Sequence, residues 1–317
     1  MKAVILDSDT LGSDIDLSPV SSLTEQFDCW GTTRPEDVVT RLEGATIAIT
    51  NKVIIDGAIM ASLPELEMIA VTATGTNNID MQGARERDIT VANVTGYGTQ
   101  SVAQHTLMIM LALATRLPRY QHDVADHLWE QAPSFCLQNH PTMQLAGKHL
   151  VLVGSGELGQ AVAQLARAFG MQVSFSARPN AERDERPTLE ALLPEADVVS
   201  LHCPLTPDTH HLIGEDYLRL MKPHVLLINC GRGGLIDEQA ALEALRCQRL
   251  GGLGVDVLPV EPPREGHDLI EALTQTPLNL IVTPHNAWIT PEARQNIVSL
   301  TMDNIRHFLA NRYKSKK

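Results

Sequence analysis

A glycine-rich segment at residues 154–159, Gly-Ser-Gly-Glu-Leu-Gly, constrains the fold of this 317-residue chain more than any other feature of its sequence. The apolar run before it, residues 149–153, has the length and composition of a buried strand. The residues after it, 160–169, have the apolar spacing of an amphipathic helix, and Gly170 follows as a stop signal. A strand, a glycine turn and a helix in this order predict the first unit of a doubly wound α/β domain.

Each glycine of the turn has its own physical reason. Gly154 allows the tight turn, Gly156 lets the backbone come close to a ligand, and Gly159 lets the helix pack closely on the strand. The first N–H groups of a helix have no partner within it, and they favour an anion such as a pyrophosphate. The turn therefore predicts a dinucleotide-binding site in the middle of the chain, and the residues before it are expected to form a separate domain.

Short β-rich runs alternate with helical stretches on both sides of the middle of the chain, as expected for α/β domains with parallel sheets. The predicted strands cover residues 3–6, 45–50, 68–72 and 90–92 in the first part, and residues 172–176, 198–202, 225–229, 252–257 and 280–283 in the second. Because 317 residues exceed one typical core, two domains are expected. The predicted fold class is α/β with two doubly wound parallel-sheet domains: a Rossmann-type nucleotide-binding domain and a smaller, flavodoxin-like substrate domain.

Helix signals indicate where the domains begin and end. Ser101-Val-Ala-Gln104 offers a capping box, and the apolar run after it predicts a helix that continues until Pro118. The boundary between the domains is therefore expected near residues 97–101. A last helix over residues 291–308 is expected to pack back on the first domain. The resulting assignment is a substrate domain of residues 1–98 and 286–317 and a dinucleotide-binding domain of residues 99–285.

The composition argues against several classes of protein. With 25 basic and 38 acidic residues the formal net charge is −13, which repels nucleic acid and anionic membrane surfaces. The most apolar helical stretch, residues 107–114, is much shorter than the roughly 20 residues of a membrane span. The N-terminus lacks the features of a signal peptide. We therefore expect a cytoplasmic protein without a nucleic-acid or membrane partner.

The cysteines and histidines favour neither disulfides nor a metal. Five cysteines are scattered without a C-x-x-C pair, so neither a disulfide framework nor a zinc site is expected. Histidines such as His210 and His211 lack carboxylate partners at metal-binding spacing, so no bound metal is predicted. Cys203 and Cys230 follow strands near the predicted cofactor, and packing is favoured over a role as thiolate nucleophile.

Three ionisable residues follow predicted strands, at the edge where open α/β sheets bind ligands. Arg232 lies in a glycine-rich turn, where its guanidinium can hold a carboxylate. His285 follows a buried strand and Pro284, so its ring would be well fixed for proton transfer, and a carboxylate such as Glu261 would favour its protonated form. Taken singly, Arg232 could be a solvated turn residue and His285 a structural one. Together with the glycine turn, these residues are what a two-substrate oxidoreductase needs.

A pair of aspartates after the first strand offers a different interpretation. Asp7-Ser-Asp9-Thr10 is similar to the aspartate pair of a phosphatase nucleophile. Nothing downstream supplies the matching lysine and acidic cluster in an obvious way. The phosphatase interpretation is therefore not favoured.

The chain resembles the D-isomer-specific 2-hydroxyacid dehydrogenase family over essentially its whole length. The motifs that carry the resemblance occur in the family's order and spacing: the glycine turn 154–159, Leu226-Leu-Ile-Asn-Cys-Gly-Arg-Gly-Gly234, Gly254-Val-Asp-Val257 with Glu261, and Pro284-His285. Three more segments look most like glycerate dehydrogenases that reduce hydroxypyruvate: Thr74-Gly-Thr-Asn-Asn-Ile-Asp80, Asn93-Val-Thr-Gly-Tyr-Gly98 and Ser101-Val-Ala-Gln-His-Thr106. The resemblance implies a homodimer that uses NAD(P)H to reduce hydroxypyruvate or glyoxylate to the D-2-hydroxy acid, and that oxidises D-glycerate in reverse.

The resemblance also implies roles for single residues. Arg232 would hold the carboxylate and carbonyl of the substrate, His285 would protonate the carbonyl oxygen during reduction, and Glu261 would keep His285 protonated. Asp256 would help to hold the nicotinamide end of the cofactor. The substrate site would also include Asn51, Lys52, Thr74, Gly75 and Thr76. The cofactor site would be lined by Gly154, Ser155, Gly156, Glu157, Leu158, Gly159, Ala177, Arg178, Cys203, Pro204, Thr209, Asn229, Cys230, Gly231 and Asp256.

The segment of residues 176–179 departs from the family members that prefer NAD. About 20 residues past the glycines those members carry an acid for the ribose 2′-hydroxyl, whereas this chain reads Ser176-Ala177-Arg178-Pro179. Arg178 can pair with a 2′-phosphate, so NADP is favoured over NAD. NAD stays an alternative because Asp184 or Glu182 could reach back to the ribose, and because Arg178 could be a solvated loop charge.

A protein of another class remains as a second hypothesis. The same fold serves a transcriptional co-repressor that resembles these enzymes and responds to the redox state of the cofactor. A nucleotide-sensing protein would bind the cofactor without appreciable turnover. The absence of added peptide-binding or regulatory segments favours the enzyme.

Overall fold

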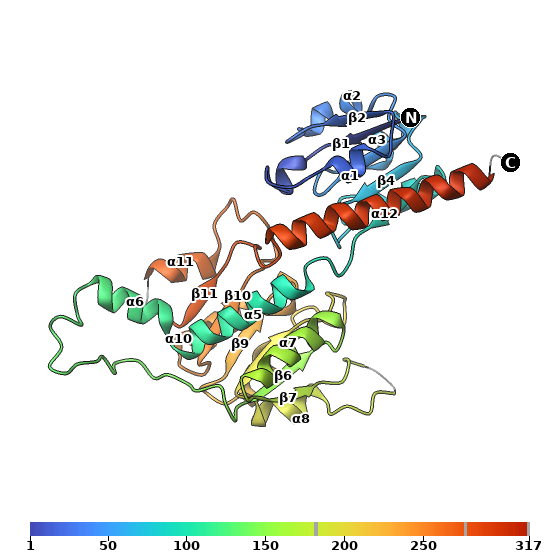
Figure 1. Cartoon of the computed structure of the whole chain (residues 1–317). Helices are drawn as coiled ribbons and strands as arrows, with labels where there is room; N and C mark the ends of the chain where they lie inside the picture. The colour runs from blue at the N-terminus through green and yellow to red at the C-terminus, as the bar shows by residue number, and fades with distance from the viewer. Residues whose placement is uncertain (181–182, 276–277, 316–317) are drawn as a thin grey trace. The chain divides into compact units, whose positions relative to one another are not determined.

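The computed structural model of the protein describes residues 1–180, 183–275 and 278–315. The chain divides into two compact units (Figure 1). Unit 1 consists of Met1–Gly98 and the residues from Ile289 onward, and unit 2 consists of Thr99–Trp288. The chain therefore returns to unit 1 at Ile289, whereas the sequence indicated residue 286.

Unit 1 is built on a parallel sheet with the strand order β2-β1-β3-β4-β5. Its strands are β1 (Lys2–Ile5), β2 (Gln26–Cys29), β3 (Ile47–Thr50), β4 (Met68–Val71) and β5 (Thr90–Asn93). This is the flavodoxin-like order, in which the chain changes direction across the sheet between β1 and β3. β3 and β4 are buried along their whole length, as expected for parallel strands covered on both faces.

Strand β2 is not predicted by the sequence. It is an edge strand, and its residues Gln-Phe-Asp-Cys are exposed or half-buried. An edge strand pairs on one side only, and this one is not buried on both faces. Its sequence therefore lacks the continuous apolar run that identifies a buried parallel strand.

Helices cover the sheet of unit 1. The short ones are the α-helices α1 (Ser18–Ser21), α2 (Val38–Leu42), α3 (Gly57–Ala61) and α4 (Met81–Glu86) and the 3-10 helices η1 (Ser8–Thr10) and η2 (Pro35–Asp37). The long helix α12 (Pro291–Ser315), red in Figure 1, extends beyond the predicted residue 308. It contacts β4, β5 and α1, and it buries Ile297, Val298 and Ile305. The C-terminal segment thus completes the core of unit 1.

Unit 2 is built on a second parallel sheet with the order β11-β10-β9-β8-β6-β7. Its strands are β6 (His149–Val153), β7 (Gln172–Phe175), β8 (Val198–Leu201), β9 (Leu226–Asn229), β10 (Gly252–Val255) and β11 (Leu280–Val282). From β6 the chain passes to β7 on one side and then crosses to β8 on the other. The direction therefore changes next to the glycine turn that follows β6. Two doubly wound parallel sheets confirm the predicted fold class.

The helices of unit 2 correct two predictions about where helices begin and end. The α-helices are α5 (Thr99–Ala114), α6 (Leu117–Ala125), α7 (Glu157–Ala168), α8 (Leu189–Leu192), α9 (Glu215–Leu220), α10 (Glu238–Arg246) and α11 (Asp268–Gln275), and the 3-10 helices are η3 (Leu193–Glu195) and η4 (Gly233–Leu235). Because α5 begins at Thr99, Ser101 lies in its first turn, and the prediction of Ser101 as the cap is wrong. The helix also ends before Pro118, because Arg116 adopts a left-handed conformation at φ +57°. Pro118 instead lies in the first turn of α6, where a proline is tolerated.

Helix α5 forms the centre of one core cluster of unit 2. It packs against α7, β9 and β10. A Cβ atom at Gly254 would overlap the Ile109 side chain of α5, so the glycine that opens the Gly254-Val-Asp-Val257 motif is required for this packing. Among the described helices, none has a stretch long and apolar enough to cross a bilayer.

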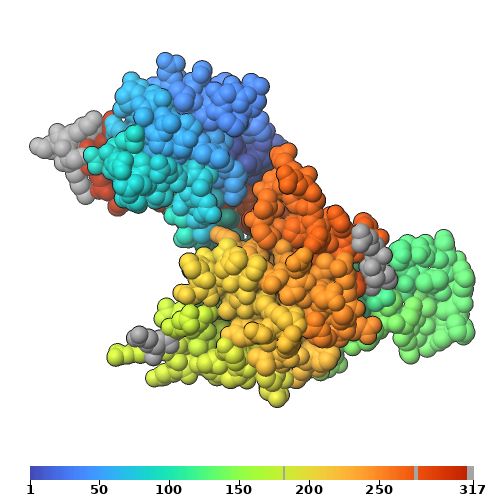
Figure 2. Space-filling model, turned by 180° about the vertical axis from the view of Figure 1, so that it is seen from behind, coloured from blue at the N-terminus to red at the C-terminus, as the bar shows by residue number. Residues whose placement is uncertain are grey.

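Residues 115–143 form an arm that stands out from the rest of unit 2 (green in Figures 1 and 2). A buried carboxylate organises this arm: Asp123 Oδ2 accepts hydrogen bonds from Asn139 Nδ2 and lies 2.8 Å from His140 Nε2. Trp129 Nε1 donates to the carbonyl of Phe135 at 2.9 Å. The side chain of Phe135 is nevertheless 88% exposed and that of Trp129 53% exposed. The arm is thus an ordered segment with large apolar side chains on its surface.

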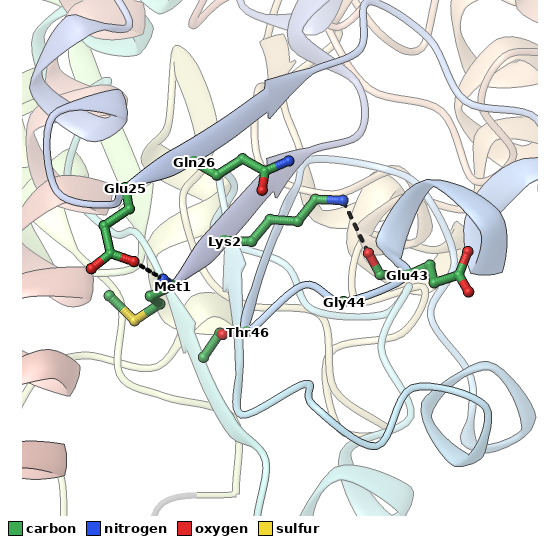
Figure 3. Close-up of a pocket in the computed structure, with 7 residues that line it drawn as sticks. All are labelled: Met1, Lys2, Glu25, Gln26, Glu43, Gly44 and Thr46. Atoms are coloured by element: carbon green, nitrogen blue, oxygen red, sulfur yellow. Dashed lines mark hydrogen bonds and ion pairs between the residues drawn. The ribbon is translucent and has the colours of Figure 1, made fainter.

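A shallow depression in unit 1 lies at the amino ends of its strands (Figure 3). It is lined by Met1, Lys2, Glu25, Gln26, Glu43, Gly44 and Thr46. Lys2 Nζ donates to the carbonyl of Glu43, and the N-terminal amine pairs with Glu25. Open α/β sheets bind ligands at the opposite, carboxyl edge, so this depression is not part of the predicted site.

Candidate active site

The glycine turn after β6 has the geometry that its sequence predicts. Gly154 has φ +112°, and a Cβ atom there would lie 2.5 Å from the carbonyl oxygen of His202. A Cβ atom at Gly159 would overlap the carbonyl of Gly154. Only glycine therefore fits at these two positions, since the first needs the left-handed conformation and the second needs the close approach of α7 to the turn.

The third glycine of the turn leaves open space at the start of α7. No atom lies within 4 Å of a Cβ position at Gly156, which is the N-cap of α7 and supplies no side-chain cap. Glu157, the first residue of the helix, accepts a hydrogen bond from the Thr99 hydroxyl at 2.8 Å. The helix thus begins with uncapped N–H groups beside a space that the protein itself does not fill. These features fit the pyrophosphate of a dinucleotide.

Arg232 follows β9 in a turn that is braced by Asn229. Asn229 Nδ2 donates to the Arg232 carbonyl at 2.8 Å, and Asn229 Oδ1 accepts from the N–H of Gly231 at 3.0 Å. The Arg232 side chain is exposed, and its Nη1 donates to the Gly231 carbonyl at 2.8 Å. Asn229, which the sequence assigned to the cofactor, is fully buried, and these contacts give it the task of shaping the arginine turn.

Gly233 brings the arginine turn against the loop that follows β10. A Cβ atom at Gly233 would overlap the backbone of Leu258 and Pro259. That loop carries Glu261, whose Oε1 accepts a hydrogen bond from the Leu258 N–H at 2.7 Å. The Arg232 turn and the Glu261 loop therefore lie side by side at the carboxyl edge of the sheet.

Glu261 and His285 form a direct pair. Glu261 Oε2 lies 2.5 Å from His285 Nδ1, and both side chains are about one-third exposed, at 32% and 39%. Burial would raise the pKa of Glu261, but the hydrogen bonds from His285 and from the Leu258 N–H, with the charge of His285, outweigh burial and lower that pKa. Among the described residues, no partner bonds Nε2 of His285. The pair therefore presents an oriented imidazole with one ring nitrogen open to a ligand.

Asp256 holds the segment that carries His285. Its carboxylate is 1% exposed and accepts hydrogen bonds from the Thr283 hydroxyl at 2.5 Å and from the N–H groups of Asn286 and Ala287 at 3.0 Å each. His105 Nε2 of α5 lies 3.4 Å from the same carboxylate and 3.0 Å from the Thr283 hydroxyl. These contacts tie α5, β10 and β11 together behind His285.

In unit 1 the residues expected to hold the substrate also lie at the carboxyl edge of their sheet. Asn51 and Lys52 follow β3, and residues 74–76 follow β4. The carbonyl of Thr74 accepts a hydrogen bond from Asn93 Nδ2 at 2.6 Å, and Asn78 Nδ2 donates to the Val53 carbonyl at 2.9 Å. The first bond ties Thr74 to the end of β5. The second, with the bond from the Ile55 N–H to the Asn78 carbonyl, ties the turn after β3 to the loop after β4.

Comparisons with known proteins identify the family. The model of the D-isomer specific 2-hydroxyacid dehydrogenase NAD binding domain matches residues 107–287. The chain is 39% identical over 312 residues to a glycerate dehydrogenase of Methylorubrum extorquens, covering 98% of this chain and 97% of that protein. The chain belongs to the D-isomer specific 2-hydroxyacid dehydrogenase family. The comparisons give no support to the nucleotide-sensing alternative.

Further relatives of this dehydrogenase cover nearly its whole length. A hydroxypyruvate reductase of Blautia hydrogenotrophica is 33% identical over 317 residues, covering 98% of this chain and 97% of that protein. A solved structure of an acyclic imino acid reductase (Bsp5) in complex with NADPH and D-Arg matches with a TM-score of 0.81 and 26% identity, covering 98% of each chain. The fold of the dehydrogenase, including both units, is thus shared with these proteins.

The segment after β7 carries the charged residues that the sequence associated with the choice of cofactor. Arg178 is exposed, and its backbone N–H donates to Asp184 Oδ2 at 3.0 Å. Asp184 also pairs with Arg186, with an Nη2–Oδ2 distance of 2.5 Å and an Nε–Oδ1 distance of 2.8 Å. The hydrogen bond from Arg186, and then that from the Arg178 N–H, lower the pKa of Asp184. Asp184 is therefore engaged by the loop itself, and Glu182 lies outside the described residues.

The cysteines of the dehydrogenase near the cofactor turn are not thiolates at neutral pH. Burial raises the pKa of Cys203 to about 11 and that of Cys230 to about 12. Thr209, in the same region, is buried and donates through its hydroxyl to the Pro204 carbonyl at 2.8 Å. These contacts favour packing roles for the two cysteines and a supporting role for Thr209.

Two residues that shape the site of the dehydrogenase were not identified from the sequence. His105 lies within the Ser101–Thr106 motif, and a hydrogen-bonding side chain on an otherwise apolar helix was the signal that could have found it. Asp7 is buried at the carboxyl end of β1 and binds the turn after β3, although its sequence suggested only the disfavoured phosphatase nucleophile. Contacts of this kind depend on which strands are neighbours, and a single sequence does not give that directly.

Proposed function

We propose that this dehydrogenase reduces hydroxypyruvate or glyoxylate to the corresponding D-2-hydroxy acid with NAD(P)H, and oxidises D-glycerate in the reverse direction. The observation that carries the proposal is the Glu261–His285 pair, whose Glu261 lies on the loop that packs against the Arg232 turn. An acid–base group beside a guanidinium at the edge that holds the dinucleotide turn suits the reduction of a keto acid. The names of the relatives in Methylorubrum extorquens and Blautia hydrogenotrophica support the same substrates.

In this proposal each catalytic side chain has a separate task. Arg232 binds the carboxylate and the carbonyl oxygen of the keto acid, and its charge stabilises the negative charge that develops on that oxygen. His285 donates a proton to the same oxygen, while Glu261 fixes the ring through Nδ1 and stabilises the imidazolium. The nicotinamide, when bound, supplies the hydride that adds to C2. In the reverse direction His285 accepts the proton of the hydroxy acid.

We assign Asn51, Lys52 and residues 74–76 of unit 1 to the binding of the small acid in this proposal. Lys52 is exposed, so its ammonium is available to a carboxylate. Gly75 has no atom within 4 Å of its Cβ position, which leaves the backbone of residues 74–76 open to a small ligand. A small acid fits these residues better than a large one. The backbone and a single ammonium can bind its carboxylate, but they offer few contacts to a larger side chain.

For the cofactor we favour NADPH over NADH. Arg178 is exposed, and Asp184, which accepts its backbone N–H, is already paired with Arg186. The guanidinium of Arg178 is therefore not neutralised by Asp184 and can bind a 2′-phosphate. The NADPH complex of the imino acid reductase supports the view that this fold accommodates that cofactor.

We also propose that the dehydrogenase acts as a homodimer in the cytoplasm. The arm of residues 115–143 exposes Leu117, Val124, Leu128, Trp129 and Phe135. Apolar side chains of this size on an ordered, projecting segment fit the core of an interface, and a second copy of the chain is the partner we assign to it. Five free cysteines fit a reducing compartment.

Parallel assays test the proposed reaction. Oxidation of NADPH and of NADH is followed with hydroxypyruvate, glyoxylate and pyruvate for the wild type and for His285→Ala. Rapid turnover of hydroxypyruvate or glyoxylate that is lost in His285→Ala supports the proposal. Cofactor binding without turnover of any keto acid contradicts it and favours a sensor.

Sedimentation velocity tests the proposed dimer. The double variant Trp129→Ser/Phe135→Ser removes the two largest exposed side chains of the arm and is expected to sediment as a monomer. Phe169→Ser is the matched control, because Phe169 is also an exposed phenylalanine of unit 2 but lies after α7. A wild-type monomer, or an arm variant that remains a dimer, contradicts the proposed interface.

A further inference from the structure

A buried aspartate binds the backbone of the turn that carries Lys52. Asp7 is 5% exposed and follows β1. Its Oδ1 accepts from the N–H of Asn51 at 2.9 Å, and its Oδ2 accepts from the N–H groups of Lys52 at 2.7 Å and Val53 at 3.3 Å. The Thr50 hydroxyl adds a contact of 3.2 Å to Oδ2. Three successive backbone N–H groups thus converge on one carboxylate.

This cluster lies at the point where the sheet of unit 1 changes direction. β1 and β3 are neighbours in the order β2-β1-β3-β4-β5, and Asp7 and Asn51 follow their carboxyl ends. In sheets of this order ligands bind at that point, and successive N–H groups in a turn form a concave site for anions. In this chain the protein's own carboxylate fills that site. A substrate anion therefore cannot use the N–H groups of residues 51–53 while Asp7 holds them.

We propose that Asp7 is a positioning residue, which fixes the backbone of residues 51–53 so that the Lys52 ammonium is directed to the carboxylate of the keto acid. The inference rests on the proposed function, because it takes Lys52 as a substrate ligand. Its basis is that the side chain of Lys52 is exposed while its backbone N–H makes the shortest of the Asp7 contacts.

The hydrogen bonds also explain how a carboxylate can stand next to a site for an anionic substrate. An unpaired buried carboxylate would repel the substrate and would be costly to bury. The three N–H dipoles and the Thr50 hydroxyl point at the charge of Asp7 and compensate it. Within the described part of the chain no carboxylate pairs with Lys52, so its positive charge is available to the substrate.

Replacement of the carboxylate by an amide tests the proposal. Asp7→Asn keeps the size of the side chain but removes its charge and places an amide N–H₂ against backbone donors. The expected result is a rise of about tenfold or more in KM for the keto acid, with a much smaller change in kcat and in the KM for NADPH. Asp56→Asn is the matched control, because Asp56 also accepts a backbone N–H, that of Ile59, in the same unit but caps α3. The control is expected to leave all three constants near the wild-type values.

A double-mutant cycle with Lys52→Ala separates positioning from a general loss of structure. If Asp7 acts through Lys52, Asp7→Asn raises KM in the wild-type background but hardly changes it in the Lys52→Ala background. Equal effects in both backgrounds overturn the proposal. The Asp7 proposal is also overturned if the enzyme turns over keto acids and Lys52→Ala leaves the KM unchanged. That result would not contradict the proposed reaction.

Hydrogen exchange gives a readout that does not depend on activity. The amides of residues 51–53 are expected to exchange slowly in the wild type and in Asp56→Asn, and at least tenfold faster in Asp7→Asn. Slow exchange in Asp7→Asn would mean that Asp7 does not hold the turn. A wild type without any keto-acid turnover would instead refute the proposed function, while the exchange data would still report on the Asp7 contacts.

Discussion

Nδ1 of His285 lies 2.5 Å from Oε2 of Glu261, although the two residues are 24 positions apart in the chain. His285 is held at φ +52°, a left-handed conformation that costs a residue with a side chain roughly 1–2 kcal/mol. Its N–H donates to the carbonyls of Asp256 at 2.8 Å and Thr283 at 3.0 Å, which fix this conformation. The strain thus fits a site where the direction of the imidazole matters more than local stability.

Substitutions of His285 and Glu261 are expected to have different effects, because His285 donates the proton and Glu261 only orients and stabilises its ring. His285→Ala should lower kcat for reduction by about 10²- to 10⁴-fold, since no other group then protonates the substrate oxygen. Glu261→Gln should lower it less, because the amide can still accept the Leu258 N–H. Glu261→Gln also replaces the ion pair with His285 by a contact to a neutral amide, so the pH profile of reduction by Glu261→Gln should differ from that of the wild type. Steady-state rates from pH 5 to 9 measure both effects.

Glu265→Gln is a suitable control for that pH profile, because Glu265 is an exposed acid of the same loop. Its profile should coincide with that of the wild type. Identical profiles for Glu261→Gln and the wild type would show that the carboxylate of Glu261 has no part in the proton transfer.

The glycines of the turn are expected to respond differently to alanine. Gly159→Ala should lower the free energy of unfolding by about 1–3 kcal/mol, because the new Cβ overlaps the Gly154 carbonyl. Gly156→Ala should leave the stability of the cofactor-free protein almost unchanged, because no atom lies within 4 Å of its Cβ position. The same variant should bind NADPH and NADH more weakly, since the Cβ enters the space left for the pyrophosphate. Urea unfolding without cofactor and fluorescence titration with cofactor distinguish the two cases, and normal cofactor binding by Gly156→Ala would count against the predicted site.

Reversal of charge at Arg178 is expected to change the choice of cofactor. Arg178→Asp should lower kcat/KM with NADPH by at least about tenfold more than with NADH, because a carboxylate repels a 2′-phosphate and can accept a ribose hydroxyl. Arg167→Asp makes the same change in net charge on the last turn of α7 and should affect both cofactors equally. Equal losses for both cofactors in Arg178→Asp would refute the role given to this arginine.

The residues at the strand ends of unit 2 could be predicted from the sequence, because each buried parallel strand is recognisable as an apolar run and its carboxyl end is therefore known. Arg232, Glu261 and His285 each follow an apolar run, and the carboxyl ends of such runs meet at one edge of the sheet. The glycine turn was predictable for a similar reason, since its requirement for small residues is local. The fold class followed from the alternation of strands and helices.

Contacts that depend on strand order were not predictable in the same way. Asp7 binds residues 51–53 only because β1 and β3 are neighbours, and nothing near Asp7 in the sequence indicates that. The tie between Asp256 and His105 likewise joins segments about 150 residues apart through the packing of α5 on β10. The edge strand β2 was missed because it has too little buried surface to leave an apolar pattern.

Glu238 is expected to make the stability of the protein depend on pH. Its side chain is 12% exposed, its Oε2 lies 2.9 Å from His267 Nε2, and within the described structure its buried Oε1 has no hydrogen-bond partner. Burial, and then the charges of Asp237 and Glu261, raise the pKa of Glu238 from 4.5 to about 7. The folded protein therefore keeps a proton that the unfolded chain releases between pH 4.5 and 7.

The free energy of unfolding should consequently fall as the pH rises from 4.5 to 7, by an amount on the order of 3 kcal/mol from this group, and should not fall further above pH 7. Glu238→Gln removes this dependence, because the amide stays neutral in both states and can still accept from His267. The variant should thus equal the wild type near pH 4.5 and exceed it by about the same amount at pH 8. Urea unfolding at intervals of half a pH unit measures the difference, and Glu243→Gln, an exposed acid of the same helix, should follow the wild-type curve. If the free energy of unfolding of Glu238→Gln depends on pH as that of the wild type does, the prediction is wrong. The carboxyl group of Glu238 would then ionise as readily in the folded protein as in the unfolded chain.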